Sequence, residues 1–244
     1  MTTQDAAPTR HDGLVEPRWG LGDAIGGWLL AYAAALVWGV VLFAATGTTS
    51  SKDLSLAMLA IGNVPLWAGF IGTAVWAGNT KGNGWVQDFR VHLRAWDVPL
   101  GIAAGVAAQF ILVPLVSMPV LWLSGQTAKD LEAPAREMAD KATGAGGVVL
   151  LVLIVGVMAP FAEELFFRGL VLRSMERRWA PWIALVASSA VFGATHFEPL
   201  QFAGLTAAGL VFGLLAQRTG RVGPAMVAHL AFNLSSIAVL LAAS

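Results

Sequence analysis

Residues 146–168 read GGVVLLVLIVGVMAPFAEELFFR. No charge occurs before Glu163, and the run then ends in Glu163-Glu164-Leu165-Phe166-Phe167-Arg168. An apolar run of this length is typical of a helix that crosses the hydrocarbon core of a bilayer, which takes about 20 residues. Charge inside such a helix costs about 3 kcal/mol per residue, and it usually marks a place where water, protons or ions are handled. The stretch therefore predicts a membrane helix with a functional site near one end.

Apolar runs of this kind recur along the whole chain. Hydrophobic residues make up 57% of the 244 residues and charged residues only 12%. At about 20 residues per span, the runs predict an all-α, polytopic bundle of about seven transmembrane helices, a multi-pass protein of the cell membrane surrounded by the lipid bilayer. We expect the spans near residues 24–46, 55–77, 97–124, 146–170, 181–197, 200–217 and 222–242.

The ionisable residues exclude several classes of function. Fifteen Lys and Arg balance 15 Asp and Glu, and most of them lie in the polar connections between apolar runs, so no surface for nucleic acid is indicated. The chain contains no cysteine, which excludes a disulfide, a thiol nucleophile and a thiolate metal site. A metal ion would need His, carboxylate or Asn ligands, and only four His residues are present.

Composition also divides the chain into parts. Residues 1–18 are polar and predict a disordered cytoplasmic tail, whereas residues 19–244 predict a single transmembrane helical domain. The motifs described below lie in a core at about residues 146–240. Two longer connections are expected to be ordinary solvated loops, with a structured alternative for each: for residues 78–96 a short cytoplasmic segment that begins in a turn, and for residues 125–145 a short interfacial helix.

The distribution of Lys and Arg predicts the orientation of the bundle, because cytoplasmic connections carry an excess of these residues. Of the 15, 11 fall on one side of the predicted spans: Arg10, Arg18, Lys81, Arg90, Arg94, Arg168, Arg173, Arg177, Arg178, Arg218 and Arg221. The amino terminus lies on that side, and we therefore expect it to be cytoplasmic. An odd number of spans then places Ser244 on the opposite side.

Three constellations of polar residues lie within the last four spans. In the first, Glu164 and Arg168 are four residues apart, a spacing that places both on one helical face and allows an ion pair. Glu163 points away by about 100° and is left free to face the interior of the bundle. A free carboxylate in a partly dry pocket is suited to accept and return a proton. The alternative is that all three charges cap the helix end in water.

The other two constellations are pairs with the same spacing of four. Phe192 and His196 share one face of the fifth predicted span, and His229 and Asn233 share one face of the last. The simpler interpretations are an interfacial His near the end of its span and an interhelical hydrogen bond that holds the bundle together. Alternatively, His229 and Asn233 offer a donor and an acceptor, or two metal ligands, to one point in the interior.

Taken together, a carboxylate pair, two His and an Asn are the groups needed to activate water against a carbonyl. The joint pattern predicts hydrolysis by an intramembrane enzyme. Other protease mechanisms lack their motifs, since the chain has no His-Glu-x-x-His and no Gly-x-Ser-x-Gly around Ser188 or Ser189. The rival hypothesis is a non-hydrolytic transporter or membrane scaffold that uses the buried Glu and His residues as a proton or ion relay.

The three constellations resemble the pattern of a known family, the CPBP intramembrane proteases. This family, also called Abi, includes the type II CAAX prenyl endopeptidase and bacterial bacteriocin-processing or immunity proteins. Its pattern is Glu-Glu-x-x-x-Arg, then Phe-x-x-x-His, then His-x-x-x-Asn. The corresponding residues here are, in order, Glu163, Glu164 and Arg168, then Phe192 and His196, then His229 and Asn233. The resemblance covers about residues 146–240 and implies an endopeptidase that cleaves a membrane-associated peptide or protein.

The resemblance also implies a role for each residue. Glu163 would be the general base and His196 its partner on the attacking water. His229 with Asn233 would stabilise the oxyanion, and the ion pair of the first constellation would hold the site together.

Two versions of the chemistry remain open. In one, which matches the frequent description of the family as metalloproteases, Glu163, His196 and His229 bind a zinc ion whose water attacks. In the other, Glu163 activates water without a metal. The sequence indicates neither a certain cofactor nor an oligomeric state.

The depth of His196 presents a geometric difficulty. At a rise of about 1.5 Å per residue, Glu163 and His229 lie within roughly 10 Å of the Arg-rich face, whereas His196 lies roughly 20 Å or more from it. Either a tilted fifth span begins deeper in the membrane, with residues 171–181 as an interfacial segment, or one of the predicted boundaries is wrong. We expect the site to line a cavity that is open toward the cytoplasm.

Overall fold

The computed structural model describes residues 14–243, and every regular element in this range that is longer than a single residue is helical. The α-helices are α1 (Leu21–Thr46), α2 (Leu56–Lys81), α3 (Trp85–Asp88), α4 (Asp97–Ala107), α5 (Val113–Ser124), α6 (Ala128–Asp140), α7 (Gly144–Leu151), α8 (Ala159–Glu164), α9 (Leu172–Glu176), α10 (Pro181–Ala194), α11 (Phe202–Thr219) and α12 (Gly223–Ala242). The other helical segments are a 3₁₀ turn, η1 (Ser51–Asp53), and the π-helical η2 (Ala108–Leu112), η3 (Val152–Met158) and η4 (Leu165–Val171).

Several of these segments join into longer membrane helices. The stretch from α4 to α5 forms one continuous helix over residues 97–124, and the stretch from α7 to α9 forms another over residues 144–176. Within residues 14–243, six helices are long and apolar enough to cross a membrane, and α10 is a shorter apolar helix. This confirms the predicted all-helical, multi-pass membrane protein.

Two of the π-helical stretches have a local cause in proline. Pro114 follows η2 and Pro160 follows η3 within the first two residues of the next α-helix. A proline has no N–H to donate, and its ring clashes with the carbonyl four residues earlier, so the backbone widens into a π turn before it. In η3 the widened turn shifts the hydrogen bond of the Ala159 N–H to the carbonyl of Ile154. Both π turns face the cavity described below.

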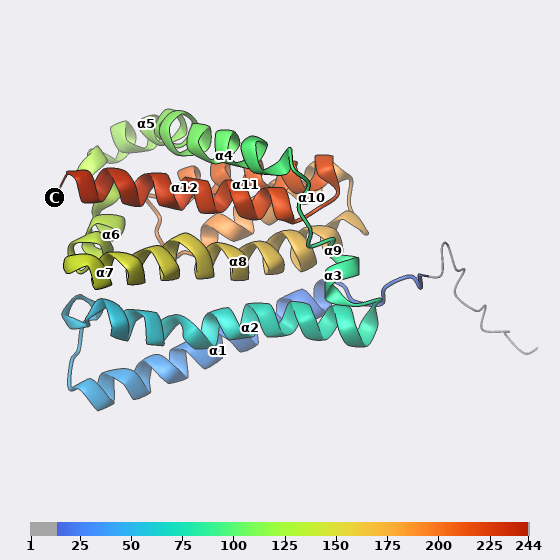
Figure 1. Ribbon diagram of the computed structural model, residues 1–244, viewed down its shortest axis with the longest axis horizontal. Helices are drawn as coiled ribbons and strands as arrows, with labels where there is room; N and C mark the ends of the chain where they lie inside the picture. Colours follow the sequence, from blue (N-terminus) through green and yellow to red (C-terminus); the bar gives the residue numbers. More distant parts are fainter. Residues whose placement is uncertain (1–13, 244) are drawn as a thin grey trace, which may run out of the picture.

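The helices form a bundle around the long helix of residues 144–176. Figure 1 shows this helix, drawn in yellow to orange, between the α1–α2 hairpin on one side and α4, α5, α11 and α12 on the other. Successive spans run in opposite directions, so that α1 begins and α12 ends at opposite ends of the bundle (Figure 1). Both long connections contain helical structure in place of the plain loops expected: residues 78–96 contain the short helix α3, and residues 125–145 contain α6, an amphipathic helix.

Close packing of α4 against α12 needs a residue without a side chain. A Cβ atom at Gly105 would overlap the backbone carbonyl of Ala228 on α12. At the start of the same two helices, Arg221 and Asp97 form a buried ion pair, with 3.2 Å from Arg221 Nε to Asp97 Oδ2. These contacts fix the position of α12, which carries two of the predicted site residues.

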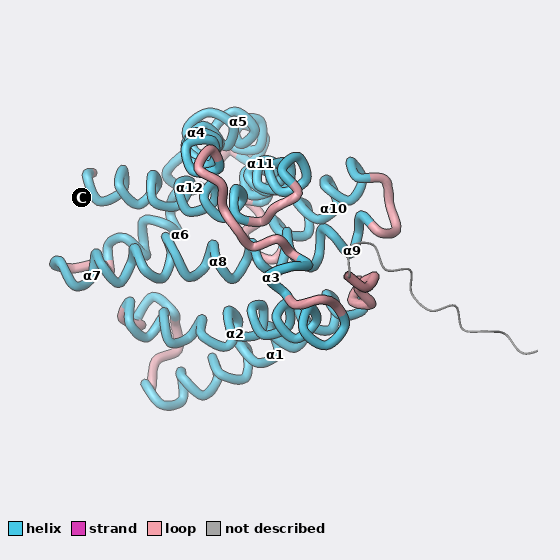
Figure 2. The backbone as a smooth tube through the Cα atoms, turned by 45° about the vertical axis from the view of Figure 1, so that its right-hand side comes forward, coloured by secondary structure: helices cyan, strands magenta, loops and turns pink. Residues whose placement is uncertain are grey.

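Of the tail predicted for residues 1–18, residues 1–13 lie outside the described part of the chain. Residues 14–18 of this tail contact the end of α2. The Arg18 N–H donates to the carbonyl of Lys81, and the Asn83 side-chain amide forms hydrogen bonds with the backbone of Val15. Figure 2 shows this segment beside the loops that follow α2 and α9, at the end of the bundle where α1 begins.

Candidate active site

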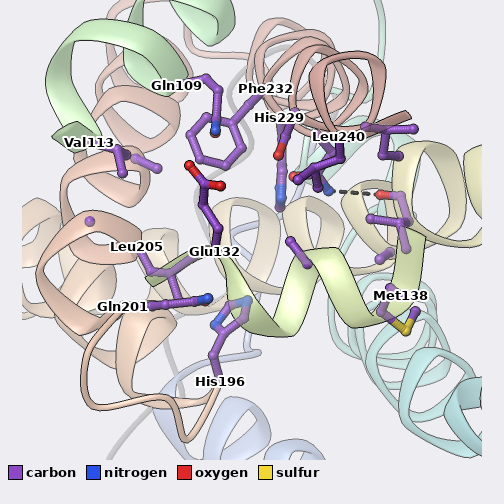
Figure 3. A pocket seen from close by; sticks show the side chains of 18 of the residues that line it. Gln109, Val113, Glu132, Met138, His196, Gln201, Leu205, His229, Phe232 and Leu240 are labelled. Atoms are coloured by element: carbon purple, nitrogen blue, oxygen red, sulfur yellow. Dashed lines mark hydrogen bonds between the residues drawn. The ribbon is translucent and has the colours of Figure 1, made fainter. Parts of the chain in front are cut away.

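The predicted site residues come from three parts of the chain. Glu163 and Glu164 end α8, Arg168 lies in η4, His196 follows α10, and His229 and Asn233 lie on α12. A cavity of about 370 Å³ brings four of them together, because Glu163, His196, His229 and Asn233 all line it. Figure 3 shows His229 directed toward this space from α12 and His196 directed toward it from the turn after α10. Glu164 and Arg168 are buried behind its wall.

Glu164 is the centre of a buried hydrogen-bond network. Its side chain is 0% exposed, and its Oε1 accepts from Arg168 Nη1 at 3.0 Å. The same oxygen lies 2.8 Å from His229 Nδ1. The spacing of four residues therefore gives the ion pair that the sequence indicates, and the carboxylate also fixes the ring of His229.

The Arg168 guanidinium is fully enclosed. Its Nη2 donates to the carbonyl of Gly209 at 3.1 Å, and its carbon atom Cζ lies over the rings of Phe192 at 4.4 Å and Phe212 at 5.5 Å. A Cβ atom at Gly209 would press against Phe192 and the guanidinium, so the absence of a side chain there leaves room for both. Ionic and cation–π contacts together offset the desolvation of this charge.

Glu163 has a different environment from its neighbour. Its side chain is 17% exposed and lines the cavity, and its Oε2 lies 3.9 Å from His229 Nε2. His229 thus lies between two carboxylates, with Nδ1 on Glu164 and Nε2 toward Glu163. The ring of His229 stacks on Phe212 with 4.7 Å between centroids. Of the two adjacent Glu residues, only Glu163 is placed to meet a molecule in the cavity.

His196 is held by the turn that ends α10. Its Nδ1 lies 2.9 Å from the carbonyl of Phe192, which leaves Nε2 for the cavity. The next residue, Phe197, has φ of 55°, a left-handed conformation that costs a residue with a side chain about 1 kcal/mol. The Tyr32 hydroxyl donates to the carbonyl of Thr195 at 2.6 Å, and the Tyr32 ring packs edge-on against Phe197. Contacts from α1 therefore support the strained turn.

The predicted difference in depth between Glu163 and His196 arises from a wrong helix boundary. The fourth span runs to Glu176 rather than to residue 170, and no interfacial segment begins at residue 171. Glu163 consequently lies near the middle of a 33-residue helix, deeper than expected. The fifth span is also shorter than predicted, because α10 ends at Ala194 and leaves His196 in the turn. Both corrections bring Glu163 and His196 to a common cavity.

Asn233 is oriented by the backbone irregularity in η3. Its Nδ2 donates to the carbonyl of Val155 at 2.8 Å. That carbonyl is free to accept because the π turn redirects the Ala159 N–H to Ile154. One N–H of the amide is therefore committed, and the second N–H remains for a molecule in the cavity.

The side chains present do not fit the zinc site that the sequence left open. Within the described range of residues 14–243, no three His, Asp or Glu side chains lie close enough together to hold a metal ion. Glu163 and His229 approach each other, but His229 Nδ1 is used by Glu164, and His196 does not complete a group of three with them.

Gln109 is a cavity residue that the sequence analysis missed. It lies in the π-helical η2, and no side-chain hydrogen bond to it is found within residues 14–243. Figure 3 shows its amide directed into the cavity near Phe232, opposite His196. A lone amide within the apolar run of residues 97–124 was a visible signal, because polar groups at this depth usually face an interior site.

The cavity extends from the site residues to the helix α6. From Glu163 and His229 it extends past Val155 and Leu240 to the helix α6, whose Glu132 and Ala135 line it. Figure 3 shows α6 in yellow-green passing across the cavity, with Glu132 directed inward. This end is opposite to the Arg-rich end, and the predicted opening toward the cytoplasm stays a prediction.

The part of the chain that contains the site is similar to a family of intramembrane proteases. Residues 145–235 match the family model described as Type II CAAX prenyl endopeptidase Rce1-like. This segment contains all six predicted site residues, and the match confirms the resemblance to the CPBP proteases over its length.

One curated relative adds to the family match. The chain is 29% identical over 86 residues to the protein named "Putative membrane peptidase YdiL" from Bacillus subtilis (strain 168). The alignment covers 35% of this chain and 35% of that relative. No solved structure matches. The two comparisons agree in pointing to a membrane protease.

Proposed function

We propose that this protein is an intramembrane endopeptidase in which Glu163 activates water to attack a peptide carbonyl. The observation that carries the proposal is the contrast between the two adjacent carboxylates: Glu164 is fixed by two partners, whereas Glu163 faces the cavity. A general base must be free to reach the water and to change its protonation state. The neighbouring carboxylate is instead suited to hold His229.

The remaining residues fit the later steps of hydrolysis. Attack of water transfers one proton to Glu163 and gives a tetrahedral oxyanion. His229 Nε2, when it carries a proton, can donate to that oxyanion, and the free N–H of Asn233 can donate beside it. Glu163 then returns its proton to the amine that leaves. His196 Nε2 is placed to hold the water before attack.

The rival hypothesis of a proton or ion relay needs a polar path on the far side of the carboxylates. There the described residues form a cluster of buried aromatic side chains, including Phe70, Phe166 and Phe167, with Phe166 stacked on Phe70 at 4.5 Å. Such packing favours a closed active-site floor over a conduction path.

The direct test is to incubate the purified protein with a library of membrane-anchored peptides and to identify products by mass spectrometry. Cleavage at a defined bond is expected. A proton flux through reconstituted protein without peptide, together with an intact library, would support the relay and overturn the protease.

Chelation is expected to leave peptide cleavage unchanged. The reason is that Glu163, His196 and His229 are not arranged to share one metal ion. Cleavage rates are compared before and after dialysis against a strong chelator, with a zinc-dependent protease as the positive control for chelation. Loss of cleavage that returns when zinc is added would contradict the metal-free mechanism.

Gln109→Leu is expected to weaken substrate binding by roughly three- to tenfold, the effect of losing one hydrogen bond of about 1 kcal/mol. We infer that the free amide of Gln109 bonds the backbone of the bound peptide. The expected result is a higher KM with a smaller change in kcat. Gln126→Leu is the matched control, because Gln126 is exposed and lies outside the cavity. Equal kinetics of the two variants would remove Gln109 from the substrate site.

A further inference from the structure

We propose that Tyr32 is a positioning residue for peptide cleavage, which holds His196 in its place relative to Glu163. The proposal rests on the proposed protease function for the roles of those two side chains. Tyr32 lies on α1, outside the residues 145–235 that match the family model, and it is the single tyrosine of the chain. One hydrogen bond, a set of ring contacts and the strained turn after α10 connect it to the site.

The hydrogen bond completes the end of α10. A helix leaves its last carbonyl groups without an intrahelical donor. The carbonyls of Gly193 and Ala194 accept from backbone N–H groups of the turn itself. The next carbonyl, that of Thr195, takes its donor from another helix, since the Tyr32 hydroxyl donates to it at 2.6 Å. Thr195 is buried, so the loss of this donor would leave a costly unpaired carbonyl and the turn would rearrange.

The turn that Tyr32 supports carries His196 directly after that carbonyl. His196 Nδ1 lies 2.9 Å from the carbonyl of Phe192. A carbonyl oxygen only accepts, so Nδ1 carries the proton and the lone pair of Nε2 is left for the water in the cavity. The residue on the other side, Phe197, has φ of 55°, a conformation that a residue with a side chain seldom adopts. Such a turn keeps its shape only where its surroundings hold it.

The Tyr32 ring lies between the two segments that carry the proposed base and its histidine partner. It packs edge-on against Phe197 with 5.6 Å between centroids, and edge-on against Phe70 of α2 with 6.1 Å. Phe70 stacks at 4.5 Å on Phe166, which follows Glu163 by three residues on the same helix. A continuous path of ring contacts therefore joins that helix to the turn after α10, and the tyrosine is in the middle of this path.

The placement of the two side chains determines the rate of the proposed reaction. Glu163 and His196 both have to reach one water molecule, and they come from different helices. Tyr32 is not among the residues that line the cavity, so it reaches the reaction through the histidine and not through the substrate. The α1 helix is in this way a working part of the active site.

Tyr32→Phe removes the hydroxyl and keeps the ring. We expect kcat to fall roughly tenfold, between the few-fold effect of one hydrogen bond and the roughly 100-fold effect of a catalytic group displaced by about 1 Å. KM should stay nearly constant, because no contact to the substrate is lost. Trp38→Phe is the matched control, since Trp38 also lies on α1, donates to the carbonyl of Ile61 at 3.0 Å and does not line the cavity. A native kcat in Tyr32→Phe would overturn the proposal.

A double-mutant cycle with His196→Ala separates positioning from a loss of folded protein. His196→Ala alone is expected to lower kcat. Adding Tyr32→Phe should then cause no further fall, because the hydroxyl acts only through the imidazole. A hydroxyl that only stabilises the fold would lower kcat by the same factor with and without His196, and that result would also overturn the proposal.

A measurement without substrate tests the positioning apart from catalysis. The ring nitrogens of ¹⁵N-labelled histidine are observed by NMR in detergent, and the signals of His196 are those missing from His196→Ala. Tyr32→Phe is expected to shift these signals, whereas Trp38→Phe should leave them unchanged. Unshifted His196 signals in Tyr32→Phe would contradict the positioning role. If the native protein cleaves no peptide, the proposed function fails, while the His196 signals still decide whether Tyr32 holds this side chain.

Discussion

Glu163→Gln is expected to lower kcat for peptide cleavage by about 10²- to 10⁴-fold, the usual contribution of a general base. Glutamine keeps the size and shape of the side chain but cannot accept the proton of the attacking water. Thermal stability should change little, because Glu163 lines the cavity and its nearest charged partner is 3.9 Å away at His229. Steady-state kinetics on one cleaved peptide and thermal unfolding in detergent measure the two quantities.

The matched control is Glu132→Gln, which removes a second carboxylate from the same cavity. Glu132 lies on α6 with a half-exposed side chain and pairs with Arg136 at 3.6 Å. Its loss should change cleavage by a few-fold at most, since an exposed pair contributes about 1 kcal/mol or less. If both variants lost activity equally, the negative charge of the cavity rather than a specific base would explain the effect.

A loss confined to the chemical step has a kinetic signature. For Glu163→Gln, kcat and kcat/KM should fall by similar factors, because the base acts in the transition state and not in peptide binding. A rise in KM at constant kcat would instead identify Glu163 as a binding residue.

The fold class could be predicted because the signal is local. Apolar runs of membrane length require helices, and the spacing of four residues puts Glu164 beside Arg168 whatever surrounds them. The separation of Glu163 from Glu164 follows from the same helical geometry. These features depend on residues close together in the chain, and the structure contains them.

The features that were not predicted depend on contacts between distant segments. The fourth span continues to Glu176 because the loop residue Phe89 packs against Gly169 and the helix stays buried beyond the membrane-length run. The turn that holds His196 depends on Tyr32, which is 163 residues away from its partner Thr195. The part of the cavity wall that α6 supplies depends on where this helix folds back against the bundle. Periodicity contains none of this information.

Arg168→Met is expected to destabilise the protein by about 3 to 5 kcal/mol, because removing one partner of a buried ion pair leaves an uncompensated charge. The variant loses the contacts to Glu164 and to the carbonyl of Gly209 in a site that is 2% exposed. Unfolding in detergent by a denaturant series gives the free energy. The free energy of unfolding of Arg168→Lys should lie between those of the native protein and Arg168→Met, since a single ammonium cannot make both contacts and stack on Phe192.

The double variant Glu164→Gln with Arg168→Met separates stability from catalysis. Removing both charges should restore a large part of the lost free energy of unfolding, because no unpaired charge stays buried. Cleavage should remain low, because His229 Nδ1 then faces a neutral amide in place of the carboxylate that lies 2.8 Å away in the native protein. A double variant that regained both stability and cleavage would show that Glu164 and Arg168 only maintain the fold. Restored stability without cleavage would assign to Glu164 the positioning of the imidazole.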